Sequence, residues 1–208
     1  MSSDLRFAGQ IAGLGTTSGI RLVVGMWHDS PLGRFGDVMI QQPDGHRVLL
    51  APSEAVADFV RGTYTFDEVR IGPVNLTGDS TRRTIGAPGL ELTFTLGGRS
   101  PIGLLLALLP QRLAVAPWWL TAINPLARIL LAGVRTAGSA GQDRREFYGA
   151  YDVHAITGAT GCWRGQDLGA LAPVKPAVTF GFGSTPSAPA VTSLVTTIRP
   201  ARRVRETP

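Results

Sequence analysis

The segment of residues 146–154 concentrates side chains that could transfer a proton. If it forms a strand, alternation places Glu146, Tyr148, Asp152 and His154 on one face. A carboxylate two positions from an imidazole can orient the ring and raise its basicity, which suits a general base. The same alternation is typical of the solvent face of any half-buried strand, and this is the stronger interpretation. We retain Asp152 and His154 as a candidate acid–base pair, with Glu146 and Tyr148 beside them.

A second group of side chains suits the binding of a ligand. Trp27 ends an apolar run and Asp37 follows a glycine-rich stretch, so both would lie near strand ends, where loops often hold functional side chains. Arg135 could orient the polar group of a guest, and Trp118 and Trp119 offer a large apolar surface. We predict ligand contacts at these five residues.

Spacing argues against several other chemistries. The three histidines are far apart and Cys162 is the only cysteine, so neither a metal site nor an internal disulfide is predicted. The sequence contains no Gly-x-Ser-x-Gly elbow and no Gly-x-Gly-x-x-Gly fingerprint. Lys175, the only lysine, has no cationic neighbour in the sequence, which argues against a Schiff-base decarboxylase. We predict no cofactor.

Composition favours a globular protein that does not bind nucleic acid. Charged residues make up 17% of the chain and hydrophobic residues 44%. Lysine and arginine outnumber aspartate and glutamate by 20 to 15, but the basic residues are spread along the chain and aromatic residues are only 7%. A nucleic-acid surface would instead gather basic side chains on one face with stacking aromatics between them.

Period-two alternation of apolar and polar residues predicts eight or nine strands. The turn Pro43-Asp44-Gly45 predicts a hairpin between two of them. Ser53 can cap a helix of about two turns, in which Val56, Phe59 and Val60 share an apolar face. The predicted strands cover residues 21–27, 37–42, 46–51, 68–76, 90–96, 144–156, 177–183 and 191–198.

Residues 100–133 differ from the rest because long apolar runs are broken by prolines, which predicts two or three short helices. Residues 92–142 contain no aspartate or glutamate, and the uncharged runs are shorter than the roughly 20 residues of a membrane-spanning helix. The favoured interpretation is that the leucines at 104, 105, 108 and 109 cover the open face of the sheet, with the tryptophans packed inside. The alternatives are a helix at the membrane interface and a protein interface.

These elements predict a mainly β (α+β) fold, either an antiparallel β-barrel or a strongly curved sheet, with an inserted apolar helical segment around residues 100–133. Residues 1–198 would form a single β-rich domain, and residues 199–208 a disordered basic tail. Gly25-Met26-Trp27 and Gly161-Cys162-Trp163 each resemble the Gly-x-Trp element of lipocalin-type barrels, which implies a barrel that binds apolar ligands. In lipocalins this element begins the first strand, whereas here its first copy ends an apolar run.

Three functions are compatible with this reading. The leading hypothesis is the binding of an apolar small molecule or lipid in a cavity of the barrel or sheet, with peripheral membrane contact through the helices. The second is a cofactor-independent enzyme of the isomerase or cyclase type that uses Asp152 and His154 on a hydrophobic substrate. The third is a protein-interaction module. No secretion signal is recognised at the N-terminus, so a cytoplasmic location is expected, with the oligomeric state open.

Overall fold

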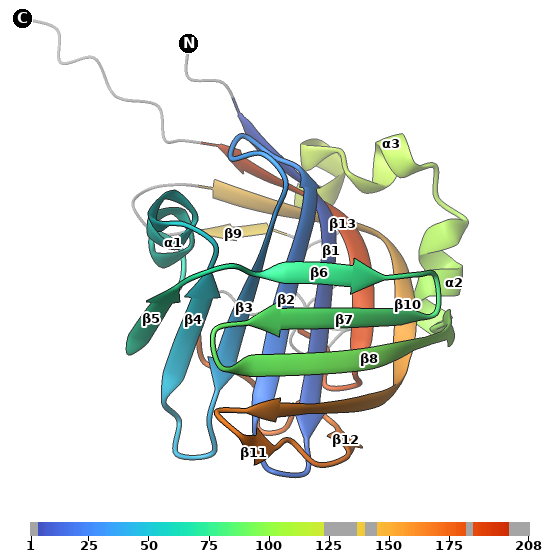
Figure 1. The fold of residues 1–208 in the computed structure, drawn as a ribbon. Coiled ribbons are helices and arrows are strands. Elements are labelled where there is room, and N and C mark those ends of the chain that lie inside the picture. Colours follow the sequence, from blue (N-terminus) through green and yellow to red (C-terminus); the bar gives the residue numbers. More distant parts are fainter. Residues whose placement is uncertain (1–3, 123–136, 140–144, 182–184, 200–208) are drawn as a thin grey trace, which may run out of the picture.

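The strands of the protein form one large, mostly antiparallel sheet that curls on itself (Figure 1). The structure is a computed structural model that describes residues 4–122, 137–139, 145–181 and 185–199. Ten strands follow each other in the order β5-β4-β3-β2-β1-β13-β10-β8-β7-β6, while β9 and β11 pair with β10, and β12 pairs with β1. The predicted mainly β fold with a strongly curved sheet is thus confirmed.

The strands are β1 (Leu5–Thr16), β2 (Arg21–Asp29), β3 (Phe35–Gln41), β4 (Arg47–Ala51), β5 (Glu68–Ile71), β6 (Asn75–Gly78), β7 (Arg82–Ala87), β8 (Leu90–Arg99), β9 (Ala137–Ser139), β10 (Arg145–Trp163), β11 (Gln166–Asp167), β12 (Leu171–Ala172) and β13 (Ala190–Arg199). The helices are α1 (Glu54–Arg61), α2 (Pro101–Ala107) and α3 (Gln111–Ala114), and residues 117–122 are also helical.

Local sequence signals determine the connections around α1. Strands β3 and β4 form the predicted antiparallel hairpin, and the Asp44 side chain accepts a hydrogen bond from the backbone nitrogen of His46 at its turn, 2.9 Å away. Ser53 caps α1 by accepting a hydrogen bond from the backbone nitrogen of Val56. The helix leads the chain into β5, which pairs with β4 in parallel. The predicted hairpin and helix are both confirmed.

The curl of the sheet brings its two ends together around the main core. A Cβ atom on Gly36 of β3 would lie 2.6 Å from the side chain of Leu76 in β6, so the absence of a side chain at Gly36 allows β6 to approach β3. The main core contains fully buried residues from both ends of the sheet, such as Val38 and Ile40 on one side and Ile85 and Phe94 on the other. Burial of this apolar surface is the main force that favours the curled shape.

The opposite face of β1 to β4 carries a second, smaller apolar cluster beneath α1. Neighbouring residues of a strand point to opposite faces, so Val38 lies in the main core while Met39 packs with the second cluster. Leu49 and Ala51 of β4 and Val56 and Val60 of α1 also belong to this cluster. The helix therefore covers the sheet face that the main core does not use.

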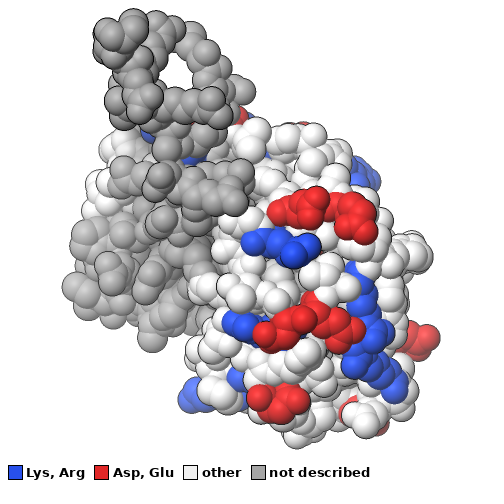
Figure 2. Space-filling model, turned by 90° about the vertical axis from the view of Figure 1, so that its left-hand side faces the viewer, with Lys and Arg blue, Asp and Glu red and all other residues white. Residues whose placement is uncertain are grey.

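The edge strand β5 is protected by charge. Glu68 of β5 lies 2.7 Å from the guanidinium of Arg164, and Arg47 of β4 pairs with Asp67 at 2.8 Å. Figure 2 views the molecule from this side and shows basic and acidic side chains interleaved over its described part. Charged side chains at an edge strand disfavour the addition of a further strand from another molecule.

The apolar segment approaches β10 most closely at two glycines, one in the segment and one in the strand. A Cβ atom on Gly103 of α2 would lie 2.2 Å from the backbone oxygen of Val153, and a Cβ on Gly149 would lie 2.7 Å from the Cα of Val115. Leu104, Leu105 and Leu108 are 58%, 65% and 79% exposed, respectively. The prediction that the leucines cover the sheet is therefore wrong for these three, because close backbone contact turns their side of the helix to solvent, while Leu109 is half-buried.

The strand predicted for residues 177–183 is also not observed in its described part, residues 177–181. There, Gly181 forms one isolated bridge with Tyr64. The side chain of Gln41 accepts a hydrogen bond from the backbone nitrogen of Thr179 at 2.7 Å and donates one to the Thr179 hydroxyl at 2.8 Å. A buried side chain of β3 thus takes the place of a partner strand for this segment.

Candidate functional site

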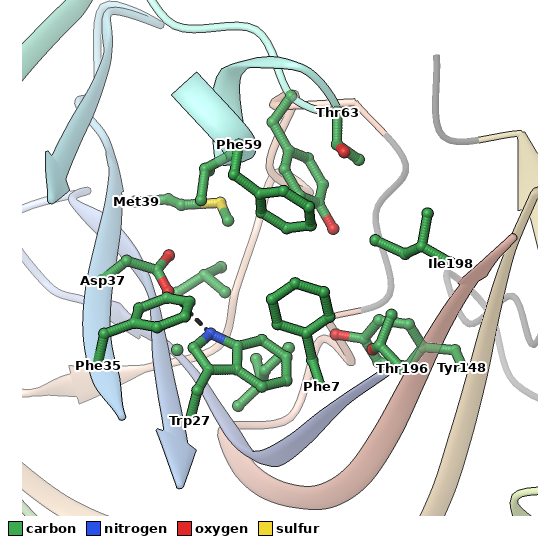
Figure 3. Close-up of a pocket in the computed structure, with 15 residues that line it drawn as sticks. Phe7, Trp27, Phe35, Asp37, Met39, Phe59, Thr63, Tyr148, Thr196 and Ile198 are labelled. Carbon is green, nitrogen blue, oxygen red and sulfur yellow. Dashed lines mark hydrogen bonds between the residues drawn. The ribbon is translucent and has the colours of Figure 1, made fainter. Parts of the chain in front are cut away.

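A pocket lies between α1 and the sheet face that carries the second apolar cluster (Figure 3). Its cavity volume is about 50 Å³. For scale, an engineered cavity of about 150 Å³ in another protein binds benzene. The lining residues are Phe7, Ile11, Val23, Gly25, Trp27, Phe35, Asp37, Met39, Phe59, Val60, Thr63, Tyr64, Tyr148, Thr196 and Ile198.

Aromatic rings form most of the pocket wall. Phe7 of β1 stacks on Phe59 of α1 with ring centroids 4.6 Å apart, and it meets the edge of Trp27 at 5.9 Å. Trp27 in turn lies 6.3 Å from Phe35 of β3. Stacked and edge-to-face geometries are the favourable ones for aromatic pairs. The wall is thus apolar and well packed, and a buried polar group in it is conspicuous.

The buried polar group in the aromatic wall is the carboxylate of Asp37, which is only 2% exposed. The indole nitrogen of Trp27 donates a hydrogen bond to Asp37 Oδ1 at 3.0 Å, as the dashed line in Figure 3 shows. Burial raises the pKa of Asp37 to about 6, and the hydrogen bond from Trp27 limits the rise. A buried acid with a raised pKa in an apolar pocket is a typical mark of a functional site.

Gly25 of β2 makes room for this hydrogen-bonded pair. It pairs directly with Asp37 across the two strands, and a Cβ atom on it would lie 2.2 Å from Asp37 Oδ1 and 2.7 Å from the Trp27 nitrogen. Because the side-chain atoms of Asp37 and Trp27 occupy that space, even alanine at position 25 would force them apart. The close pair therefore depends on a glycine at position 25.

Two further polar groups line the pocket from β10 and β13. Tyr148 and Thr196 are paired across these strands, and they are 8% and 3% exposed. The Thr196 hydroxyl has no hydrogen-bond partner among the described residues. In the view of Figure 3, Phe7 lies between this pair and Trp27. A ligand in the pocket would thus meet polar groups in two separate places.

The structure separates the residues predicted to share one face of β10. Tyr151 is an extra residue in this strand, because Ala150 pairs with Leu194 while Asp152 pairs with the next residue of β13, Ser193. The bulge reverses the alternation, so Tyr148 lies on one face and Asp152 and His154 lie on the other. The prediction that Tyr148, Asp152 and His154 share a face is therefore wrong. Glu146 lies in β10 opposite Ile198, and its side chain is outside the described residues.

Asp152 and His154 form a polar cluster outside the pocket. Arg99 binds Asp152 with two hydrogen bonds of 3.0 and 3.2 Å. Burial raises the pKa of Asp152, but the hydrogen bonds and charge of Arg99 outweigh it, and the pKa lies below its ordinary value. The two ring nitrogens of His154 face acceptors, Gly97 O at 3.1 Å and Asp152 Oδ2 at 3.4 Å. Both ring nitrogens of His154 therefore have an acceptor nearby within the protein.

The remaining candidates lie elsewhere. Trp118 is 67% exposed and contacts Trp119 edge to face, with ring centroids 6.0 Å apart. Arg135 lies outside the described residues. Lys175 is exposed and does not belong to the pocket lining. Of the nine candidates, the pocket brings together Trp27, Asp37 and Tyr148.

Sequence reasoning missed several lining residues, above all Phe7 and Thr196. Phe7 lies in β1, whose many glycines hide its strand character. Thr196 belongs to a predicted strand, but a threonine in a β-branched run carries no signal that its hydroxyl is buried without a partner. Phe59 was placed on the apolar face of the helix, which is the face that lines the pocket.

Comparisons with known proteins identify structural neighbours but no family. No protein-family model matches the sequence, and no curated protein matches it. An acetoacetate decarboxylase from Legionella pneumophila aligns with 96% of this chain and 86% of its own, with 8% identity and a TM-score of 0.46. An AttH protein from Nitrosomonas europaea aligns with 97% of this chain and 53% of its own, with 13% identity and a TM-score of 0.36. At these scores neither neighbour bears on the chemistry of the pocket.

Proposed function

We propose that the protein binds a small, largely apolar molecule in the pocket beneath α1. The observation that carries this proposal is the Asp37–Trp27 pair, a hydrogen-bonded polar group buried in an aromatic wall. Binding sites for small molecules are typically apolar, with a few polar groups that orient the ligand. A cavity volume of about 50 Å³ limits the ligand to a few carbon atoms unless side chains move.

The pocket supports binding better than it supports acid–base catalysis by Asp152 and His154. Both residues lie outside the pocket lining. Arg99 binds the Asp152 carboxylate, and both His154 nitrogens face acceptors within the protein, an arrangement that favours a structural role for this pair over a general base. The acid that the pocket does contain is Asp37.

A titration with 1-butanol tests the binding proposal. We expect the wild-type protein to show saturable changes of amide NMR signals at residues that line the pocket. The variant Gly25→Ala should lose this response, because its methyl group enters the space of the Asp37–Trp27 pair. Gly86→Ala is the matched control, since Gly86 also lies in a strand and a Cβ there meets no atom within 4 Å. An equal response in all three proteins would show that the pocket is not the binding site.

A second function is favoured by the exposed apolar residues of the helical segment. We define the apolar patch as Leu104, Leu105, Leu108 and Trp118, which are 58–79% exposed. Arg112 is exposed in the same segment, and residues 92–142 contain no acidic residue. No helix in the described part of the chain is long and apolar enough to cross a membrane. We propose that the apolar patch makes peripheral contact with an anionic membrane surface.

Vesicle co-sedimentation tests this contact. We expect the protein to bind vesicles of phosphatidylcholine and phosphatidylglycerol, and the double variant Leu105→Glu, Leu108→Glu to bind at least about tenfold more weakly, since each leucine contributes roughly 2 kcal/mol when buried. Leu32→Glu is the control, because Leu32 is 37% exposed outside the apolar patch. Equal binding of all three proteins would refute the membrane contact. The apolar patch would instead be a protein interface if the molecular mass of the wild type in solution rises with protein concentration while that of the double variant stays constant.

A further inference from the structure

The carboxylate of Asp37 lacks a partner of opposite charge. It is 2% exposed, and no arginine, lysine or histidine of the described residues forms an ion pair with it. The side-chain hydrogen bond to this carboxylate among the described residues comes from the neutral indole of Trp27, which donates to Oδ1. A buried carboxylate without a counter-charge is costly, and such groups in proteins are usually paired. Within the described part of the chain, the pocket thus places no positive charge beside this carboxylate.

The aromatic rings around Asp37 also favour the binding of a cation. In Figure 3 the Asp37 carboxylate lies beside the ring of Phe35 and the indole of Trp27. The rings of Phe7 and Phe59 continue the wall, within 4.6 to 6.3 Å of a neighbouring ring. Aromatic faces carry negative charge density and attract ammonium groups, which is how aromatic cages recognise organic cations. A carboxylate ligand would instead be repelled by Asp37, and a neutral one would leave its charge uncompensated.

We propose that the pocket selects a short-chain amine in its ammonium form, with the ammonium group on Asp37 and the carbon chain against Phe7 and Phe59. This inference rests on the proposed binding function and specifies its ligand class. The ammonium donates a hydrogen bond to the Asp37 carboxylate and supplies the positive charge in the same contact. The limited free space favours amines of a few carbons over longer or branched ones.

The pH dependence of amine binding follows from the titration of Asp37. The other titratable side chains of the pocket lining are Tyr64 and Tyr148, and phenols ordinarily titrate near pH 10. With the pKa of Asp37 raised to about 6, most of the carboxylate is ionised at pH 7.5 and most is protonated at pH 5. Because the ammonium form of the amine is constant over this range, we expect the Kd for an amine to rise by about tenfold between pH 7.5 and pH 5.

Calorimetric or NMR titrations with three molecules of equal chain length test the inference: n-butylamine, 1-butanol and butyrate. At pH 7.5 we expect the wild-type protein to bind n-butylamine at least about tenfold more tightly than 1-butanol, as a charge-assisted hydrogen bond is worth about 1.5 kcal/mol or more. Butyrate should bind most weakly. In Asp37→Asn the ratio of the Kd for 1-butanol to the Kd for n-butylamine should fall from at least about ten to about one. Asp44→Asn, which removes an exposed carboxylate from the β3–β4 turn, should keep the wild-type ratio.

The outcomes separate the two proposals. If 1-butanol binds as tightly as n-butylamine, or if Asp37→Asn keeps the preference for the amine, the inference is wrong while the binding function stands. If none of the three molecules binds, both are wrong. A Kd for n-butylamine that does not change between pH 7.5 and pH 5 would also refute the role of Asp37.

Discussion

Replacement of Asp37 by asparagine is expected to stabilise the protein at pH 7.5, by up to about 3 kcal/mol. Asparagine can still accept the hydrogen bond from Trp27, and it removes the buried charge. The difference between the ordinary pKa of 3.8 and about 6 corresponds to about 3 kcal/mol that the folded state loses when Asp37 ionises. A residue that lowers stability in this way is typical of a functional site.

The sign of the pH dependence follows from proton binding. Between pH 3.8 and about 6 the folded protein holds the Asp37 proton more tightly than the unfolded chain does, so this group's contribution to stability falls as the pH rises. The cost of ionisation is about 1 kcal/mol at pH 4.5 and about 3 kcal/mol at pH 7.5. The advantage of the variant over the wild type should therefore grow by about 2 kcal/mol between these two pH values.

Urea unfolding of both proteins at pH 4.5 and pH 7.5 measures this difference. Carboxylates with a lowered pKa, such as Glu68 and Asp79, act in the opposite direction, but they are common to both proteins and cancel in the comparison. Asp44→Asn controls for the loss of one negative charge at an exposed site. A variant that is less stable than the wild type at pH 7.5, or a difference that is equal at both pH values, would contradict the buried charge at Asp37.

The largest loss of stability is expected for Phe7→Ala. Phe7 is 2% exposed, stacks on Phe59 and contacts the edge of Trp27, so its removal takes away contacts with both α1 and β2. Truncation of a buried phenylalanine costs about 3–5 kcal/mol, through lost apolar burial and the cavity that remains. The free energy of unfolding at pH 7.5, measured in urea, should fall by this amount.

Phe66→Ala is the matched control, because Phe66 is a half-buried phenylalanine that contacts Phe180 outside the pocket lining. Its loss of stability should be clearly smaller. The enlarged pocket of Phe7→Ala should also bind benzene, so benzene should raise the Tm of this variant and leave that of Phe66→Ala unchanged. A loss below about 1 kcal/mol for Phe7→Ala would mean that Phe7 is not a principal packing residue of the pocket.

Elements with local signals could be predicted from the sequence, and elements that depend on distant contacts could not. The β3–β4 hairpin and the capped helix α1 are specified by Asp44-Gly45 and Ser53, which act within a few residues. Strand β1 was missed although it is central in the sheet. Its glycines weaken the strand signal, but Gly9 is required because a Cβ there would lie 2.3 Å from the backbone oxygen of Met26.

In the candidate site, too, local sequence signals could be predicted and contacts between distant residues could not. Trp27 and Asp37 were singled out as residues near loops, but what joins them is the register of β2 and β3, which places Gly25 opposite Asp37. The face shared by Tyr148, Asp152 and His154 was predicted from strict alternation, and the single extra residue Tyr151 reverses it. A bulge of this kind depends on how β10 fits β13, so periodicity in the sequence does not reveal it.

The central pairing of β1 with β13 also has a consequence for how the protein folds. Gln10 and Ser193 meet across these strands although they are 183 positions apart in the chain. The pocket takes Phe7 from β1 and Thr196 and Ile198 from β13, so its wall is completed when the last described strand joins the sheet. During synthesis, β1 therefore has to wait until β13 has left the ribosome before this closure can occur, and such distant pairing is characteristic of slow folding.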